Sequence, residues 1–194
     1  MITIKVIAGS TRPGRFNPQV AEWAQETASR FDDEVRIELV DLAEINLPLL
    51  DESVPASSGE YEHEHTKDWS KVIAEADGFI FVTPEYNHSI SAALKNAIDY
   101  LYAEWSYKPA TIISYGSAGG GTRAAEHLRG ICAEIKIYDL REQLILANYW
   151  DRLDESGQYQ FSEGEETALE AQLNSLIFWA KQMKTAREEL AQIS

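Results

Sequence analysis

The chain has 194 residues, of which 44% are hydrophobic and 25% are charged, and we expect residues 1–194 to form a single globular domain. Its 17 basic and 32 acidic side chains give a formal net charge of −15, which argues against nucleic acid or an anionic membrane as a partner. We expect a cytoplasmic protein, because there is no long apolar run, no signal-like N-terminal segment and no second cysteine to pair with Cys132.

The first elements predict a phosphate site. An apolar run over residues 2–8 indicates a buried strand, and apolar residues at helical spacing over residues 20–31 indicate a helix. Asn17 would be its N-cap, followed by a first-turn proline. The segment between strand and helix carries Arg12 and Arg15, and arginines beside a helix N-terminus attract anions. An ordinary loop with exposed arginines is the alternative.

The next part of the chain predicts an edge strand and a long acidic loop. Residues 35–39 alternate apolar and charged side chains, as a half-exposed strand does. Residues 51–65 are acidic and contain proline and glycine, which indicates a surface loop whose role we leave open. His63 and His65 in this loop could bind a metal, but no cysteine or third histidine lies close by, so we favour a solvated loop and assign no metal site.

Two central strands follow, each ending in a distinctive loop. Residues 78–83 are apolar and β-branched, and they end at Pro84-Glu85-Tyr86-Asn87, before a helix that starts near Ser91. Residues 111–115 form the next strand, and the glycine-rich segment 116–121 follows it. In the helix after this segment, Cys132 falls on the apolar face, which indicates a buried structural thiol.

The C-terminal part predicts a fifth strand and a long helix. The strand lies within residues 135–146, and residues 151–160 read as a polar link. Ser162 and Glu165 form a capping box before a helix whose apolar stripe packs on the sheet. A wider stripe that includes Ile177 and Trp179 could also serve a dimer contact.

Alternating strands and helices predict an α/β fold of three layers, with a five-stranded parallel sheet in the order 2-1-3-4-5. Ligands bind such sheets at the carboxyl ends of the strands, near strands 1 and 3. This rule brings together residues 9–17, 84–90 and 115–121. One is suited to a phosphate, the second to a flat ring with polar edges, and the third exposes backbone N–H groups. A flavin mononucleotide fits best, since neither a Walker lysine motif nor G-x-G-x-x-G is present.

The same residues carry a family resemblance. Four motifs occur in order, namely Gly9-Ser10-Thr11-Arg12 with Arg15, Thr83-Pro84-Glu85-Tyr86-Asn87, Leu94-Lys95-Asn96-Ala97-Ile98-Asp99, and Ser114-Tyr115-Gly116 with Gly119-Gly120. From Met1 to about Trp150 the chain resembles the NADPH-dependent FMN reductase family, which has a flavodoxin-like fold and includes quinone, azo-dye and chromate reductases. The family commonly has proline where Ser91 stands, and Ser91 can instead cap the helix that follows it.

The resemblance implies a site for non-covalently bound FMN. Residues 10–17 would hold the phosphate and ribityl chain, residues 84–87 would line the isoalloxazine ring, and Tyr115 with the glycines would close the other side. The cofactor-binding residues that we predict are Ser10, Arg12, Arg15, Phe16, Asn17, Pro84, Glu85, Tyr86, Asn87, Ser114, Tyr115, Gly116 and Gly119. It also implies a homodimer or homotetramer with the flavin near the subunit interface.

The predicted activity is FMN-dependent hydride transfer from NADPH or NADH to a quinone, free flavin or similar acceptor, by a ping-pong mechanism. Since the flavin carries the redox chemistry, we name no catalytic residue. A flavodoxin-like electron carrier is the alternative, which the acidic surface would suit. Within the motifs, Glu85 could be a solvated loop acid, and Tyr86 is better suited to packing on the ring than to donating a proton. The sequence names neither the acceptor nor the preferred nucleotide.

Overall fold

Five stretches rich in β-branched and aromatic residues form a parallel sheet in the computed structural model, which describes residues 1–31 and 34–193. The strands are hydrogen-bonded in the predicted order, β2-β1-β3-β4-β5. Their bounds are β1 Ile2–Ala8, β2 Val35–Asp41, β3 Gly78–Pro84, β4 Pro109–Gly116 and β5 Tyr138–Ala147. The order reverses between β1 and β3, so the carboxyl ends of these strands are where such a fold places a ligand.

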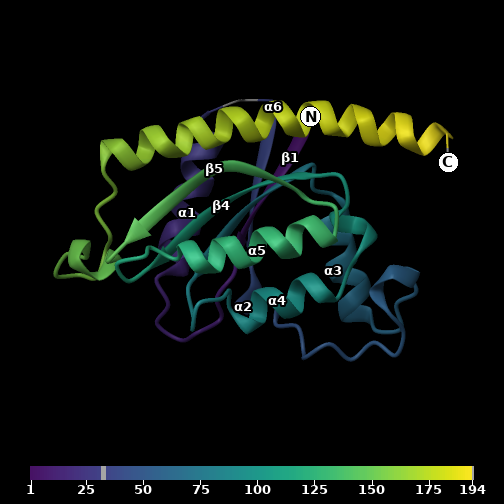
Figure 1. The fold of residues 1–194 in the computed structure, drawn as a ribbon, viewed down its shortest axis with the longest axis horizontal. Coiled ribbons are helices and arrows are strands. Elements are labelled where there is room, and N and C mark those ends of the chain that lie inside the picture. The colour runs from purple at the N-terminus through teal and green to yellow at the C-terminus, as the bar shows by residue number, and fades with distance from the viewer. Residues whose placement is uncertain (32–33, 194) are drawn as a thin grey trace.

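Helices cover both faces of this sheet, which gives the predicted three layers (Figure 1). One face carries α1 Asn17–Ser29 and α6 Glu163–Ile193. The other face carries α3 Glu64–Ala74, α4 Ala92–Asp99 and α5 Thr122–Glu134. Short segments complete the chain: α2 Leu42–Ile45, η1 Ala56–Ser58, η2 Ala103–Trp105 and η3 Tyr149–Arg152.

A separate hydrophobic core lies on each face of the sheet. Trp23, Leu173 and Leu176 pack on one face, and Trp69 and Trp105 are buried on the other. Burying each such side chain contributes about 1.5–3 kcal/mol, so the helices on both faces stabilise the sheet. Cys132 lies in the second core, where burial raises the pKa of its thiol to about 12, in agreement with a structural role.

The long helix α6 runs across the sheet and is fixed near its C-terminal end (Figure 1). Asp77, just before β3, accepts hydrogen bonds from Lys184 Nζ at 3.0 Å, from Arg187 Nη2 at 2.6 Å and from the backbone N–H of Thr3 at 3.1 Å. The capping box at the other end is confirmed, since the Ser162 backbone N–H donates to Glu165 at 2.7 Å and Glu165 N–H donates to Ser162 Oγ at 3.3 Å.

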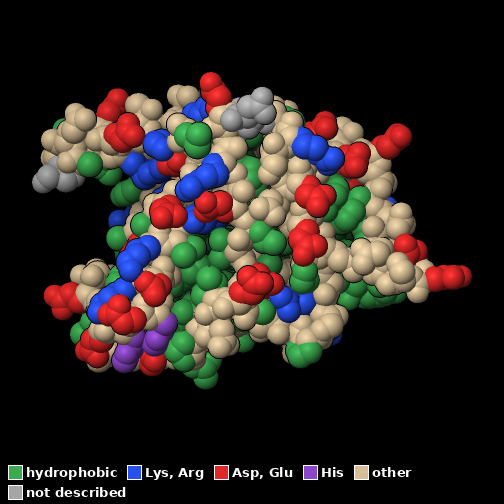
Figure 2. Space-filling model, turned by 180° about the vertical axis from the view of Figure 1, so that it is seen from behind, with side chains coloured by type: hydrophobic (Ala, Val, Ile, Leu, Met, Phe, Trp, Pro, Cys, Tyr) green, Lys and Arg blue, Asp and Glu red, His purple; other side chains and the backbone are tan. Residues whose placement is uncertain are grey.

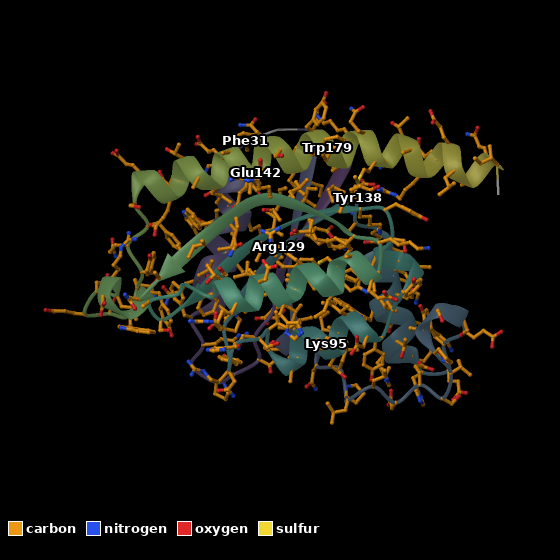
Figure 3. The ribbon with its side chains drawn as sticks, viewed as in Figure 1. Phe31, Lys95, Arg129, Tyr138, Glu142 and Trp179 are labelled. Atoms are coloured by element: carbon orange, nitrogen blue, oxygen red, sulfur yellow. The ribbon has the colours of Figure 1, made fainter. Side chains whose placement is uncertain are left out.

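In the wider apolar stripe of α6, some residues are buried in the core and others lie at the surface. Ile177 is buried, whereas Trp179 is 42% exposed and lines a groove together with Tyr138 of β5. Figure 3 labels these two aromatic residues on the same side of the molecule. A dimer contact through Trp179 therefore stays a prediction, and Ile177 would take no direct part in it.

The acidic segment 51–65 is held by hydrogen bonds to its surroundings. Asp51 accepts a hydrogen bond from Tyr100 Oη at 2.9 Å, and Glu52 accepts one from the backbone N–H of Glu62 at 2.8 Å. Glu52, Glu62 and His63 bring potential ligand atoms within 4.8 Å of one another. Glu52 and Glu62 also accept hydrogen bonds within the loop, from Ser53, Glu62 and His63.

The negative charge is spread over the molecule. On the face drawn in Figure 2, acidic side chains lie over many elements and basic side chains are interspersed among them. In the part of the chain that the structure describes, no helix combines the length and apolar character that crossing a bilayer requires.

Candidate functional site

The loops that follow β1, β3 and β4 touch one another at the carboxyl edge of the sheet. The N–H of Gly9 donates to the carbonyl of Val82 at 2.9 Å, and Ser10 Oγ lies 2.9 Å from Tyr86 Oη. Glu85 N–H donates to the carbonyl of Tyr115 at 3.1 Å. The structure therefore brings together the three loops that the sequence predicts to converge.

Asn17 has a different local role from the one predicted. The N-cap of α1 is Phe16, and no side chain caps this helix, so the prediction of Asn17 as N-cap is wrong. The Asn17 side chain is fully buried, where it accepts a hydrogen bond from Ser10 N–H at 3.3 Å and donates one to the Val82 carbonyl at 3.0 Å. These bonds tie the first loop to β3. Among the described residues, no side-chain cap is found for the first N–H groups of α1.

The two arginines of the first loop differ in their surroundings. Arg15 forms an ion pair with Asp41 at the end of β2, and both side chains are mostly buried. Its Nε is also buried, with no hydrogen-bond partner among the described residues. Arg12 is exposed, and its guanidinium carbon lies 6.0 Å from the centre of the Tyr86 ring. Arg12 is thus the accessible cation of this loop, whereas the charge of Arg15 is already balanced.

The second loop is a tight hairpin. Tyr86 and Ser89 exchange backbone hydrogen bonds of 2.9 and 3.1 Å, and the two residues between them, Asn87 and His88, have φ angles of 52° and 68°. Two consecutive left-handed residues are typical of a type I′ turn. Ser91 Oγ accepts a hydrogen bond from the N–H of Leu94 at 3.0 Å, which confirms that Ser91 caps α4.

Glu85 joins the hairpin to α5. Its carboxylate accepts hydrogen bonds from the backbone N–H of Arg123 at 3.1 Å and from Arg123 Nη1 at 3.0 Å. Burial opposes ionisation, but these hydrogen bonds and the N–H of Ala124 outweigh it and lower the pKa of Glu85 below its ordinary value. With only 12% of its side chain exposed, Glu85 is a cap for α5, and the alternative of a solvated loop acid is wrong.

The third loop, residues 116–121, contains two consecutive left-handed glycines. Gly120 and Gly121 have φ angles of 57° and 82°, and a Cβ on Gly121 would lie 2.9 Å from the backbone nitrogen of Tyr115. Ser114 on β4 is fully buried, and its hydroxyl donates to the Gly120 carbonyl at 2.8 Å. Ser114 therefore shapes this loop from inside the protein, and Gly116 and Gly119 stay at its partly exposed surface.

An aromatic cluster under the site was missed by sequence reasoning. The Phe16 ring stacks on Tyr149 of η3 at 4.4 Å and meets Tyr115 edge-on at 5.3 Å. Tyr159 lies 5.1 Å from Phe16 in what the sequence indicated as a polar link. Aromatic residues at 149, 150 and 159 were the available signal. Phe16 and Tyr115 are both buried in this cluster, beside the loops that follow β1 and β4.

The residues at this edge suit a phosphate-bearing cofactor. The first turn of α1 has no side-chain cap, and the exposed cation Arg12 precedes it by a few residues. Free N–H groups at a helix N-terminus and an accessible guanidinium are the groups that bind phosphate. The Tyr115 hydroxyl is buried without a hydrogen-bond partner among the residues described, and burial raises its pKa, so it is held as a neutral donor.

Residues 2–151 match the model of the family described as NADPH-dependent FMN reductase. The chain belongs to this family. This is the family that the four motifs resemble, and its description names NADPH and FMN.

Several proteins similar to this family member are known. The NAD(P)H-dependent FMN reductase ntnL of Nectria sp is 44% identical over 131 residues, which cover 65% of each chain. LOT6 of Saccharomyces cerevisiae, also an NAD(P)H-dependent FMN reductase, is 42% identical over 127 residues, or 60% of this chain and 66% of LOT6. The match thus spans just under two thirds of these fungal relatives. A 2-hydroxy-1,4-benzoquinone reductase of Burkholderia sp is 30% identical over 93% of this chain and 97% of its own length.

A solved structure supports the flavodoxin-like fold assignment over nearly the whole chain. FerB, an NAD(P)H:acceptor oxidoreductase from Paracoccus denitrificans, superposes with a TM-score of 0.72 at 20% identity, covering 94% of this chain and 99% of FerB. Since this coverage exceeds the family match, it includes part of α6, which carries none of the four motifs.

Proposed function

We propose that this protein is an FMN-dependent NAD(P)H oxidoreductase that passes reducing equivalents to a quinone, a free flavin or a similar flat acceptor by a ping-pong mechanism. The observation that carries the proposal is the uncapped N-terminus of α1 beside Arg12, in the loop whose Ser10 contacts Tyr86 of the hairpin. The hairpin in turn contacts the end of β4 through Glu85 and Tyr115. When bound, FMN would supply the hydride-accepting ring, and no side chain need act as a nucleophile.

We propose two roles for the residues of the site: some would contact the cofactor, and others would hold the loops in position. Arg12 and the first N–H groups of α1 would bind the phosphate, with Arg15 reaching it by sharing or releasing Asp41. Ser10, Asn17 and Ser114 are buried and would position the loops. Phe16 and Tyr115 would pack beneath the ligand.

The remaining ring contacts would come from the hairpin and the glycine loop. Pro84, Glu85, Tyr86 and Asn87 would line the isoalloxazine ring, and their backbone would meet its polar edge. Gly116 and Gly119 would allow close approach from the other side. Backbone N–H groups in these loops would stabilise negative charge on the reduced ring, because preorganised donors act strongly where water is excluded.

A homodimer or homotetramer would place a second copy near this edge of the sheet, and we propose this assembly on the resemblance alone.

The deciding experiment is FMN binding followed by anaerobic reduction. The purified protein should bind FMN, and rapid mixing with NADPH or NADH should bleach the flavin band without a second protein. An acceptor panel of quinones and free flavins should then restore it. Arg12→Ala should weaken FMN binding, and Arg30→Ala, at the other end of α1, should not. Failure to bind FMN would overturn the proposal. If FMN binds but neither NADPH nor NADH reduces it, the electron carrier would be favoured.

A further inference from the structure

A chain of polar side chains connects the glycine loop to the edge strand β5. Ser114 Oγ donates to the carbonyl of Gly120 at 2.8 Å and accepts a hydrogen bond from Gln143 Nε2 at 2.9 Å. Gln143 lies on β5, paired with Ile112 of β4. Since a hydroxyl has one proton, the bond from Gln143 leaves that proton of Ser114 directed to Gly120.

The carbonyl oxygen of the Gln143 side chain is bonded to α5, the helix that follows the glycine loop. Gln143 Oε1 accepts a hydrogen bond from Arg129 Nη2 at 3.2 Å. Arg129 Nη1 donates to the Leu140 carbonyl at 3.1 Å and forms an ion pair with Asp139. Figure 3 shows Arg129 between α5 and β5. With both amide atoms engaged, the orientation of the Gln143 side chain is fixed.

This chain acts on the one peptide in the loop that lies between two left-handed glycines, Gly120 and Gly121. Glycine adopts several backbone conformations at little cost, so this peptide is not fixed by steric limits on φ and ψ. A peptide is planar and trans, so turning the Gly120 carbonyl to Ser114 sends the N–H of Gly121 to the opposite side. Two other carbonyls of the loop accept local backbone hydrogen bonds, since Ser117 accepts from Gly120 N–H at 2.8 Å and Gly119 accepts from Thr122 N–H at 3.0 Å.

We infer that Gln143 is a positioning residue, which holds the Gly120–Gly121 peptide in the orientation that the cofactor site requires. The inference about the loop stands on the hydrogen bonds above, and its consequence for the cofactor rests on the proposed function. Neither the four motifs nor the proposed FMN contacts include Gln143, Arg129 or Asp139.

Gln172 on α6 provides a matched control. Gln172 is buried, whereas Gln143 is partly buried. Gln172 Nε2 donates to Thr111 Oγ1 at 2.9 Å and to the Ile112 carbonyl at 3.0 Å, on the same strand as Ser114, and to the Glu142 carbonyl at 3.2 Å. Gln172 makes no hydrogen bond to residues 116–121 within the described part of the chain. Gln172→Leu therefore removes a buried amide of α6 that contacts β4, and it leaves the described hydrogen bonds of the glycine loop intact.

The first measurement is amide hydrogen exchange of residues 116–122 in the protein without FMN. Gln143→Leu and Ser114→Ala should each accelerate exchange in this segment several-fold, and Gln172→Leu should not. Gln143→Glu is a second test, because a carboxylate keeps the contact with Arg129 but would draw the Ser114 proton away from Gly120, so it should behave like Gln143→Leu. Wild-type exchange in Gln143→Leu and Gln143→Glu would overturn the inference.

The second measurement is the dissociation constant of FMN for the same variants. Gln143→Leu and Gln143→Glu should weaken FMN binding about threefold to tenfold, as for one lost hydrogen bond, and Gln172→Leu should leave it unchanged. Faster loop exchange with unaltered FMN affinity would overturn the link to the cofactor. A wild-type protein that fails to bind FMN would refute the proposed function, and the exchange data would still decide the role of Gln143 in the loop.

Discussion

At the scale of single residues, the ion pair between Arg15 and Asp41 decides how the first loop could bind a phosphate. We expect Arg15→Ala to weaken FMN binding by about 1.5–3 kcal/mol, the contribution of a charged hydrogen bond, or roughly tenfold to a hundredfold. Asp41→Asn should tighten binding, because it frees the guanidinium while Asn Oδ1 can still accept the hydrogen bond from Ala43 N–H that caps α2. Titrating FMN fluorescence measures both, and an unchanged dissociation constant for Arg15→Ala would remove Arg15 from the phosphate site.

Glu85 gives a prediction about pH. Its pKa in the folded protein is lowered from 4.5, so its ionised form stabilises the fold. This contribution is fully present above the unfolded pKa and is lost as pH falls through the folded pKa. Glu85→Gln should therefore be less stable than wild type at pH 7, and the difference should shrink as pH falls below 4.5 and through the lowered pKa of Glu85. Urea unfolding across this range measures it, and a difference that stays constant with pH would contradict the role of the carboxylate.

At the scale of elements, two glycines of one helix region should respond oppositely to the same substitution. Gly121→Ala places a Cβ 2.9 Å from Tyr115 backbone atoms at a φ of 82°, so we expect a loss of about 1–3 kcal/mol. Gly130→Ala, within α5, meets nothing within 4 Å and should stabilise the protein by up to about 1 kcal/mol. Denaturant unfolding tests the pair, and equal effects would show that the turn does not require glycine at position 121.

At the scale of the whole molecule, we propose that residues 1–194 fold as one domain although the family match ends at residue 151. Leu173 of α6 is fully buried in the core that it shares with Trp23 and β1. Leu173→Ala should cost about 2–5 kcal/mol, a large share of the stability of such a domain.

The measurement follows unfolding by two probes. Tryptophan fluorescence reports on both faces of the sheet, through Trp23 on one and Trp69 and Trp105 on the other, and far-ultraviolet circular dichroism reports on the helices. The two transitions should coincide and shift together in Leu173→Ala. Two separated transitions would contradict folding as one cooperative domain.

The strand order and two helix caps could be predicted because they depend on patterns of residues close together in the sequence. The strand order followed from the alternation of apolar strands and amphipathic helices, together with the right-handed crossover rule. The convergence of the three loops followed from the order of the strands. The capping box at Ser162 and the cap at Ser91 were recognisable because each involves residues three positions apart.

The tertiary structure decided the contacts between residues that lie far apart in the chain. The sequence predicted Asn17 as an N-cap, but its buried side chain instead donates a hydrogen bond to the Val82 carbonyl. Glu85 could have been a solvated loop acid, but its carboxylate accepts a hydrogen bond from the backbone N–H of Arg123 at the start of α5. The pair Arg15–Asp41, the stack of Phe16 on Tyr149 and the bond from Gln143 to Ser114 join segments with no shared local pattern. Periodicity and capping signals describe neighbours along the helix or strand, whereas the partners of a buried polar or aromatic side chain are set by how the layers pack.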